Sequence, residues 1–233
     1  MDRARYDAVC AAAHEESILK TLCGDDGFAL VGNAATKPLA KGELLFQQDD
    51  DGDFAALILS GAVKVSTFSA SGREVVYAYL SAGALVGELS ALDGSPRTAA
   101  AIVIEKGEAA IIARKDLRLL LEDRPAIALS IIETLCARLR ATNALIESDR
   151  SFATGPRLAR GLLRLLNEHG VNDGGALRVG FKISQSDLGA FVSLSRENVN
   201  RQLHEWADAG WVALASGRVN VLDRDALEEI ADY

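Results

Sequence analysis

The stretch from Ile183 to Val212 reads ISQSDLGAFVSLSRENVNRQLHEWADAGWV, and it decides how the C-terminal part of the chain folds. Its apolar residues recur at helical spacing in two short runs, separated by a polar turn. Ser184 and Ser195 each stand where an N-terminal helix cap is expected, and Asp187 follows Ser184 at the capping-box position. The pattern therefore predicts two short helices joined by a tight turn.

The second of these helices has two distinct faces. Val199, Leu203 and Trp206 lie on its inner face, and polar residues share the outer face at helical spacing. Arginine can bind guanine through two hydrogen bonds and glutamate can accept from cytosine, so side chains of these types read base edges in the major groove. The predicted DNA-binding residues are Arg196, Glu197, Asn200 and Arg201.

An exposed, salt-bridged helix is the simpler interpretation of the same polar face. The residues that follow argue against it, because GWVALASGRVNVLDRDAL contains two short apolar runs and then Asp223, which can cap a final helix. The order helix, helix, hairpin predicts a winged helix-turn-helix.

The distribution of charge agrees with a nucleic-acid partner. The whole chain has a net charge of −8, but residues 150–201 contain eight Lys and Arg against four acidic residues. A local positive region on an acidic protein is the pattern expected when one surface meets phosphate and the rest keeps the protein soluble.

The N-terminal half has a different pattern. Residues 37–115 consist of short runs rich in Val, Ile, Leu, Phe and Tyr, punctuated by glycine, which predicts an antiparallel β-barrel or jelly roll. Residues 1–30 are more helical in pattern. We therefore predict an α+β chain with a β jelly roll, a long helix and a winged helix-turn-helix.

Within the strand-rich half, the segment GELSALDGSPRTAA from Gly87 to Ala100 combines the carboxylate of Glu88 with the guanidinium of Arg97, nine positions apart. A surface ion pair of little energetic value is one interpretation. Strand-like runs lie on both sides, however, so the loop is expected to connect strands of a packed sheet. A ligand that offers both an anion and a hydroxyl would use both side chains.

Residues 126–151 contain no glycine or proline and predict a long helix. An apolar stripe with alternating spacings of three and four is typical of a coiled-coil seam, and its residues are Ile132, Leu135, Leu139, Thr142 and Ile146. The helix could pack on a second copy, which the narrow stripe favours, or on its own barrel. Thr142 and Asn143 could set the register of the seam or contact a ligand between barrel and helix.

From about residue 15 onward the chain resembles the bacterial Crp/Fnr family, and within it the cyclic-AMP receptor subgroup. The resemblance is specific because the Gly-Glu-Leu of residues 87–89, the Arg-Thr-Ala of residues 97–99, the long helix and the Arg-Glu of residues 196–197 all match. It implies a cyclic-nucleotide-binding domain at 1–124, a dimerisation helix at 125–150 and a DNA-binding domain at 151–233.

The resemblance also implies roles for individual residues. Arg97 would bind the cyclic phosphate, Thr98 would add a hydroxyl donor and Glu88 would accept from the ribose 2′-OH. The implied ligand-binding set is Val65, Gly87, Glu88, Leu89, Arg97, Thr98, Thr142 and Asn143. Cyclic AMP is the implied ligand, and cyclic GMP remains an alternative because Thr98 is also the residue of many cyclic-GMP sites.

The implied function is a homodimeric transcriptional regulator, gated by a cyclic nucleotide, that binds palindromic TGTGA-like sites and works with RNA polymerase. A Crp-like regulator that needs no ligand is the alternative. A nucleotide-handling enzyme is disfavoured because His14, His169 and His204 are scattered and no metal cluster or nucleophile with a base stands out. A kinase-type regulatory subunit would have no use for Arg196, Glu197 and Arg201. The predicted helix that contains them is called the reading helix below.

The remaining features point to the cytoplasm. The chain has no apolar run long enough for a membrane span and no signal-peptide pattern at its start. Its three cysteines, Cys10, Cys23 and Cys136, are odd in number and far apart, which suits a reducing compartment and offers no metal-binding pair.

Overall fold

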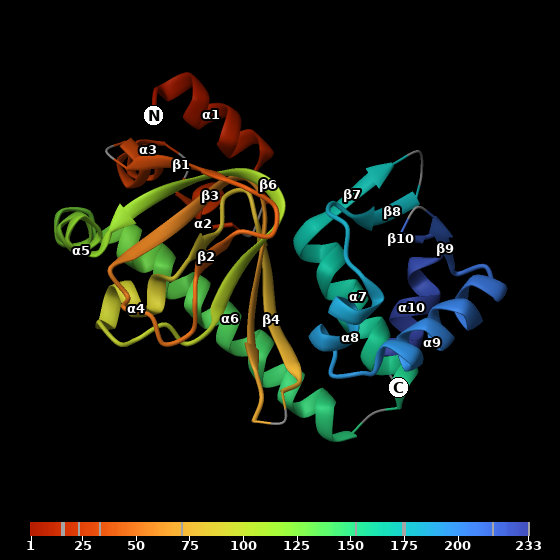
Figure 1. Cartoon of the computed structure of the whole chain (residues 1–233). Coiled ribbons are helices and arrows are strands. Elements are labelled where there is room, and N and C mark those ends of the chain that lie inside the picture. The colour runs from red at the N-terminus through yellow and green to blue at the C-terminus, as the bar shows by residue number, and fades with distance from the viewer. Residues whose placement is uncertain are drawn as a thin grey trace. The chain divides into compact units, whose positions relative to one another are not determined.

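A long strand, β3 (Phe54–Phe68), lies at the centre of the N-terminal sheet (Figure 1). The computed structural model gives a six-stranded sheet in the order β1-β6-β3-β4, with β2 paired to β6 and β5 paired to β3. The other strands are β1 (Ala35–Leu39), β2 (Leu44–Phe46), β4 (Glu74–Ser81), β5 (Leu85–Val86) and β6 (Ala100–Ala113). β3 runs antiparallel to β6, with Leu57 opposite Ala110 and Val65 opposite Ala101. The predicted antiparallel β fold is confirmed.

The structure divides the chain into two units, Met1–Thr67 with Tyr77–Leu139 and Phe68–Val76 with Arg140–Tyr233. The residues it does not describe are Glu15, Glu16, Cys23, Asn33, Ser71, Phe152, Gly174, Gly175, Ser216 and Tyr233. For residues 144–151 and Asp173 it describes the backbone alone. Cys23 and the side chain of Ile146, both named above, therefore lie outside the described part of the chain.

Both faces of β3 are buried, which explains why its first half is almost continuously apolar. Successive side chains of a strand point to opposite faces. Leu57 packs with Leu117 and Ile127 beneath the helices. Ile58 belongs instead to the inner cluster of the β roll, with Phe46, Val63 and Val86, and Phe54 and Val65 pack against this cluster. The inner cluster is the surface on which the candidate ligand site is built.

Among the described residues, six helices belong wholly or partly to the N-terminal unit. They are α1 (Arg3–Ala12), α2 (Ile18–Thr21), α3 (Asp25–Gly32), α4 (Glu88–Asp93), α5 (Arg114–Asp123) and α6 (Pro125–Ser151). The helical start and the long helix predicted from the sequence are confirmed. α6 begins at Pro125, because proline is tolerated in the first turn, where its missing N–H has no helical partner.

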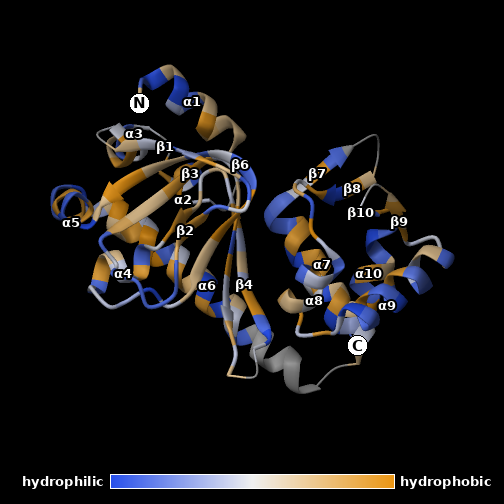
Figure 2. Cartoon of the chain, in the orientation of Figure 1, coloured by the Kyte–Doolittle hydropathy of each residue, from blue (hydrophilic) through white to orange (hydrophobic). Residues whose placement is uncertain are grey.

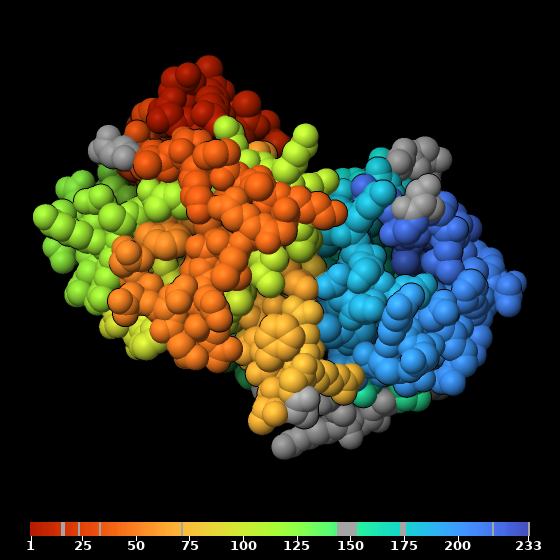
Figure 3. Space-filling model, viewed as in Figure 1, coloured from red at the N-terminus to blue at the C-terminus, as the bar shows by residue number. Residues whose placement is uncertain are grey.

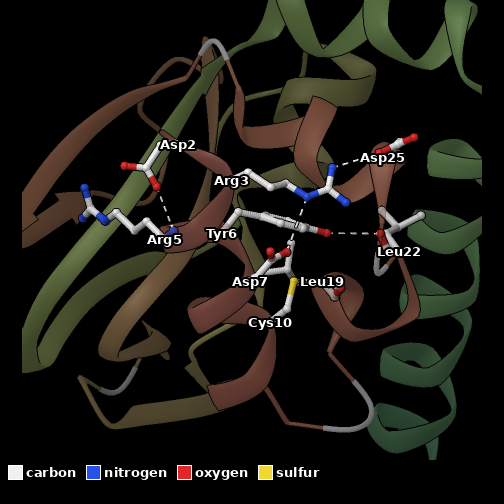
Figure 4. A network of polar contacts seen from close by, with 9 residues as sticks. All are labelled: Asp2, Arg3, Arg5, Tyr6, Asp7, Cys10, Leu19, Leu22 and Asp25. Atoms are coloured by element: carbon white, nitrogen blue, oxygen red, sulfur yellow. Dashed lines mark hydrogen bonds and ion pairs between the residues drawn. The ribbon is translucent and has the colours of Figure 1, made fainter.

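The N-terminal helices are fastened to one another by polar contacts (Figure 4). Arg3 donates to Asp25 over 2.8 Å, and the Tyr6 hydroxyl donates to the carbonyl of Leu22 over 3.3 Å. The amide of Leu19 in α2 donates to the carbonyl of Gly83 over 3.2 Å, just before β5. The surface view shows α1 in red over one end of the unit (Figure 3). These helices therefore support the strand that leads into the ligand-site loop.

The exposed stripe of α6 differs from the predicted one. Leu135 is partly buried and packs against the core of its own unit, which is the alternative that the sequence left open beside a second copy. Among the described side chains of the helix, the large exposed apolar ones are Leu129, Ile132 and Leu139, and Cys136 is exposed as well. Alternating spacings of three and four fit two neighbouring faces of one helix, and burial against the barrel selects between them.

The second unit contains a helical core and a small sheet. Its elements are α7 (Thr154–His169), β7 (Gly170–Asp173), β8 (Ala176–Val179), α8 (Gln185–Phe191), α9 (Arg196–Asp208), β9 (Val212–Ala215), β10 (Arg218–Val221) and α10 (Arg224–Ala231). The sheet order is β7-β8-β10-β9. Figure 2 shows the apolar positions of α7 in orange, and its Leu158, Leu162, Leu165 and Leu166 are buried. The β7–β8 pair belongs to this sheet although its segment is rich in Gly, Asn and Asp, residues that are typical of turns.

Candidate functional site

The loop between β5 and β6 is shaped by two glycines. Gly87 caps the start of α4 and Gly94 caps its end, both in the left-handed conformation, with φ of 77° and 81°. A Cβ atom on Gly87 would lie 2.5 Å from Nη1 of Arg97. Backbone conformation and space therefore both require glycine at position 87.

Arg97 is almost completely buried, with 1% of its surface exposed. Its Nη1 donates to the carbonyl of Gly87 and its Nη2 to the carbonyl of Phe54, each over 2.7 Å. The guanidinium lies 4.3 Å from the ring centre of Phe46 and 4.6 Å from that of Phe54. Among the described residues its Nε has no hydrogen-bond partner. A buried cation with a spare donor is a fitting receptor for an anion.

Burial lowers the pKa of Arg97, and the carboxylates of Asp53, Glu88 and Asp50 raise it in opposition. An arginine side chain stays protonated in proteins at neutral pH. The lowered pKa of Arg97 thus reflects the cost of burying its charge. A further negative charge close to the guanidinium would offset that cost.

Glu88 is also buried, with 5% of its surface exposed, and it has a partner that sequence reasoning missed. Nη1 of Arg138, on α6, contacts its Oε1 at 2.5 Å, and Nη2 of Arg138 donates to the carbonyl of Leu85 over 2.7 Å. Arg138 precedes Thr142 by one helical turn. The prediction that Thr142 contacts a ligand could have drawn attention to Arg138 as well, because residues four positions apart share one face of a helix.

The structure thus brings Gly87, Glu88 and Arg97 together. Leu89 is exposed on α4 and Thr98 is exposed after Arg97. Val65 is half-buried and packs against the inner cluster of the roll. Thr142 and Asn143 belong to the other unit of the chain, so their contact with a ligand stays a prediction.

The reading helix has the two faces that the sequence predicts. Ser195 caps α9 by accepting from the amide of Asn198 over 3.2 Å, and Ser184 caps α8 by accepting from the amide of Asp187 over 3.0 Å. The inner residues Val199, Leu203 and Trp206 are buried. The four predicted base readers are exposed: Arg196, Glu197, Asn200 and Arg201.

Two amide side chains hold this exposed face in order, and neither was singled out from the sequence. Nη2 of Arg201 donates to Oδ1 of Asn198 over 3.1 Å. Nε2 of Gln185, at the start of α8, donates to Oδ1 of Asn200 over 3.3 Å. The spacing of Asn198 and Arg201, three residues apart on a helix, was a readable signal. The contact between Gln185 and Asn200 depends on how α8 crosses α9, which no local pattern reports.

The turn between the two helices is fixed by an arginine of α7. Nη2 of Arg157 donates to the carbonyls of Val192 and Ser193, over 3.1 and 3.0 Å. Ser193 adopts the left-handed conformation, with a φ of 56°, which is uncommon for a residue other than glycine. Arg157 therefore stabilises a strained turn that sets the angle of the reading helix.

Neither a metal centre nor a membrane helix is found in the described part of the chain. The described residues contain no group of three or more His, Cys, Asp or Glu side chains that could hold a metal ion. Among the described helices, none combines the length and apolar character that crossing a membrane requires.

Comparisons with known proteins agree with this geometry. Residues 36–124 match the family described as cyclic nucleotide-binding domain, and residues 156–230 match the Crp-like helix-turn-helix domain. The chain is 35% identical over 188 residues to the CRP-like cAMP-activated global transcriptional regulator of Mycobacterium tuberculosis, covering 80% of this chain and 84% of that protein. It is 34% identical over 191 residues to the cyclic AMP receptor protein of Thermus thermophilus, covering 82% and 85%.

The fold is also found in solved structures. FixK2 from Bradyrhizobium japonicum superposes with a TM-score of 0.74 at 19% identity, covering 84% of this chain and 96% of that chain. At this identity the likeness concerns the fold alone. The match to the Crp-like helix-turn-helix domain and the similarity to the regulator of Mycobacterium tuberculosis place the chain among transcriptional regulators and not among enzymes.

Proposed function

The chain belongs to the Crp/Fnr family of cyclic-nucleotide-binding, DNA-binding transcriptional regulators, and from this premise we propose that it is a homodimer whose affinity for a palindromic TGTGA-like site is raised by cyclic AMP. Cyclic AMP is favoured over cyclic GMP because the two relatives named above carry cyclic AMP in their names. The single observation that carries the proposal is the buried guanidinium of Arg97 beside the buried carboxylate of Glu88.

The division of labour in the pocket follows from charge. A cyclic monophosphate has one negative charge and one free ribose hydroxyl. Arg97 would bind the phosphate through its unused donor and Thr98 would add a hydroxyl, while Glu88 would accept from the 2′-OH. Gly87 and Leu89 shape the loop and Val65 lines the inner face. Thr142 and Asn143 would contact the base.

Arg138 gives the pocket a connection to the long helix. Because it binds Glu88 and the carbonyl of Leu85 together, a hydroxyl that binds Glu88 must share that carboxylate with Arg138. Rearrangement of this contact would change the setting of α6. Coupling of about 1–3 kcal/mol between ligand and DNA is enough to change DNA affinity about 5- to 150-fold.

The dimer is proposed from the exposed side of α6. Leu129, Ile132, Cys136 and Leu139 form an apolar stripe at alternating spacings of three and four, and Leu139 exposes 62% of its surface. A second copy of the helix would cover this stripe as in a coiled coil. The same register places Asn143 next in the stripe, where a polar residue sets the alignment of two helices.

DNA recognition is assigned to the exposed face of α9. Arg196, Glu197 and Arg201 would read the half-site, and Asn200 would contact the adjoining base pair. Two such helices on a dimer would meet half-sites about 34 Å apart, one turn of the duplex. A regulator of this kind acts with RNA polymerase on the chromosome, so we place the protein in the cytoplasm.

A regulator that needs no ligand is the second candidate, and one observation favours it. Glu88 already has Arg138 as partner, and Arg97 already donates to two carbonyls. Calorimetric titration of the wild-type protein with cyclic AMP and with cyclic GMP separates the candidates. Binding of cyclic AMP supports the proposal, binding of cyclic GMP alone changes the ligand, and binding of neither favours the ligand-independent regulator.

A further inference from the structure

The acidic loop of residues 48–53, before β3, lies directly against the loop of residues 87–99 that contains Arg97. The second of these is called the cassette loop below. The amide of Arg97 donates to the carbonyl of Asp50, and the amide of Asp49 donates to the carbonyl of Arg97, each over 2.9 Å. Between them and β3, a Cβ atom on Gly52 would lie 2.2 Å from Cβ of Ser90. Main-chain pairing and close packing thus fix this acidic loop relative to Arg97.

Asp53 is the residue of the loop whose side chain approaches the guanidinium. Its main chain is fixed, because its carbonyl accepts from the amide of Arg114 over 2.7 Å. Its Oδ1 lies 4.0 Å from Nη2 of Arg97, the limit of an ion pair. The side chain of Asp53 is 79% exposed, whereas that of Arg97 is 1% exposed. The carboxylate can therefore turn into solvent while the guanidinium stays in place.

The other carboxylates that act on Arg97 are engaged elsewhere. Glu88 is bound by Arg138. Asp50 accepts from the amide of Gln47 over 2.8 Å, so its carboxylate is part of the turn itself. Among the described residues that act on Arg97, Asp53 is thus the one whose carboxylate is held neither by an arginine of another helix nor by its own turn.

From this geometry we propose that Asp53 is the internal counter-ion of Arg97 in the ligand-free protein, and that the phosphate of the cyclic nucleotide replaces it on binding. The inference rests on the function proposed above and adds a determinant of affinity to it. A phosphate that shares Arg97 with Asp53 experiences repulsion between two negative charges at short range. The wild-type affinity is then the result of an exchange of counter-ions, and Asp53 sets the ligand concentration at which the pocket fills.

The test compares two variants with the same change of charge in the same loop. Asp53→Asn removes the carboxylate next to Arg97 and keeps the shape of the side chain and the main-chain bond to Arg114. Asp51→Asn removes a charge at an exposed neighbouring position that is not among the groups acting on Arg97. Binding of cyclic AMP to both variants and to the wild type is measured by calorimetry at low and high salt.

We expect Asp53→Asn to bind cyclic AMP about 3- to 10-fold more tightly at low salt, with a smaller difference at high salt because added ions screen the repulsion. Asp51→Asn should stay within about 2-fold of the wild type, because Asp51 is exposed and is not among the groups that act on Arg97. In the absence of ligand, Asp53→Asn should lower the melting temperature relative to Asp51→Asn, since it leaves a buried guanidinium without its counter-ion.

Equal affinities of the two variants, or weaker binding by Asp53→Asn, would overturn the proposal. Weaker binding would assign Asp53 to holding Arg97 for the phosphate instead of competing with it. If the wild type binds neither cyclic AMP nor cyclic GMP, the proposed function fails. In that case the melting temperatures of the ligand-free variants test the counter-ion role of Asp53 by themselves. A lower melting temperature of Asp53→Asn than of Asp51→Asn supports this role, and equal melting temperatures overturn it.

Discussion

Arg138 on the long helix contacts Glu88 in the cassette loop at 2.5 Å and also donates to the carbonyl of Leu85 over 2.7 Å. One side chain of α6 therefore binds both the strand that enters the cassette and the carboxylate assigned to the ribose. The two residues are fifty positions apart in the sequence. This contact links the proposed ligand pocket to the helix that leads to the DNA-binding unit.

Arg138→Leu should remove the effect of cyclic AMP on the affinity for DNA. Removing the guanidinium frees Glu88 to bind the ribose hydroxyl but breaks the connection to α6, so cyclic AMP should still bind while its effect on DNA affinity falls toward none. Since coupling is worth about 1–3 kcal/mol, the lost effect is about 5- to 150-fold. Fluorescence anisotropy of labelled duplex, with and without cyclic AMP, measures it.

Arg118→Leu is the matched control for Arg138→Leu, because Arg118 is an exposed arginine of the neighbouring helix α5. It should keep the full response to cyclic AMP. A full response in Arg138→Leu as well would show that the contact with Glu88 plays no part in the coupling.

Arg97→Leu should abolish ligand binding while leaving the fold intact. Leucine can occupy the apolar space between Phe46 and Phe54, but it offers no charge to the phosphate. Loss of charge-assisted hydrogen bonds worth about 1.5–3 kcal/mol each should weaken cyclic AMP binding by about 100-fold or more. Calorimetry measures the affinity and circular dichroism checks the fold. If this variant binds cyclic AMP as tightly as the wild type, Arg97 does not belong to the ligand pocket.

Arg201→Ala should reduce the preference for the cognate site more than it reduces the affinity for DNA of unrelated sequence. If Arg201 reads a guanine, its loss should cost about 1–3 kcal/mol on the cognate site and relax the preference at that base pair. Asn198→Ala, which removes the acceptor that holds Arg201, should give a smaller change in the same direction. Competition between cognate and scrambled duplexes at one salt concentration measures both, and equal weakening on the two duplexes would mean that Arg201 contacts phosphate only.

Ser193 offers a prediction about stability. Because its φ is 56°, glycine should relieve the strain of the left-handed conformation, and Ser193→Gly should raise the free energy of unfolding by about 0.5–1 kcal/mol. Ser193→Val should lower it by about 1 kcal/mol or more, because a β-branched side chain resists this conformation. Urea denaturation measures both, and the opposite order would contradict the account of the turn.

Much of this fold could be predicted from local pattern. The caps Ser184 and Ser195, the inner residues of α9 and the strand-rich half of the chain all carry their signal within a few neighbouring positions. The strands β7 and β8 were missed because their segment, rich in Gly, Asn and Asp, reads as a turn, and its pairing with the hairpin of β9 and β10 is a tertiary contact.

At the candidate site, too, local sequence patterns do not report tertiary contacts. Glu88 and Arg97 were readable because they stand nine positions apart in a segment of mostly small and apolar residues between two strand-like runs. Arg138 was not singled out, because on the sequence it is one more charge on a long helix; only the packing of α6 against the cassette brings it to Glu88. For a related reason the spacing of Leu135 did not show whether it packs on its own unit or on a second copy, since spacing defines a stripe but not its partner.

The most direct test of the central claim is a titration of the purified protein with cyclic AMP while its binding to a labelled TGTGA-N6-TCACA duplex is followed at one fixed salt concentration. The account predicts that cyclic AMP tightens binding about 5- to 150-fold and that cyclic GMP does so less. Binding that is equal with and without either nucleotide would contradict ligand gating, and failure to bind the duplex at all would contradict the assignment of Arg196, Glu197 and Arg201.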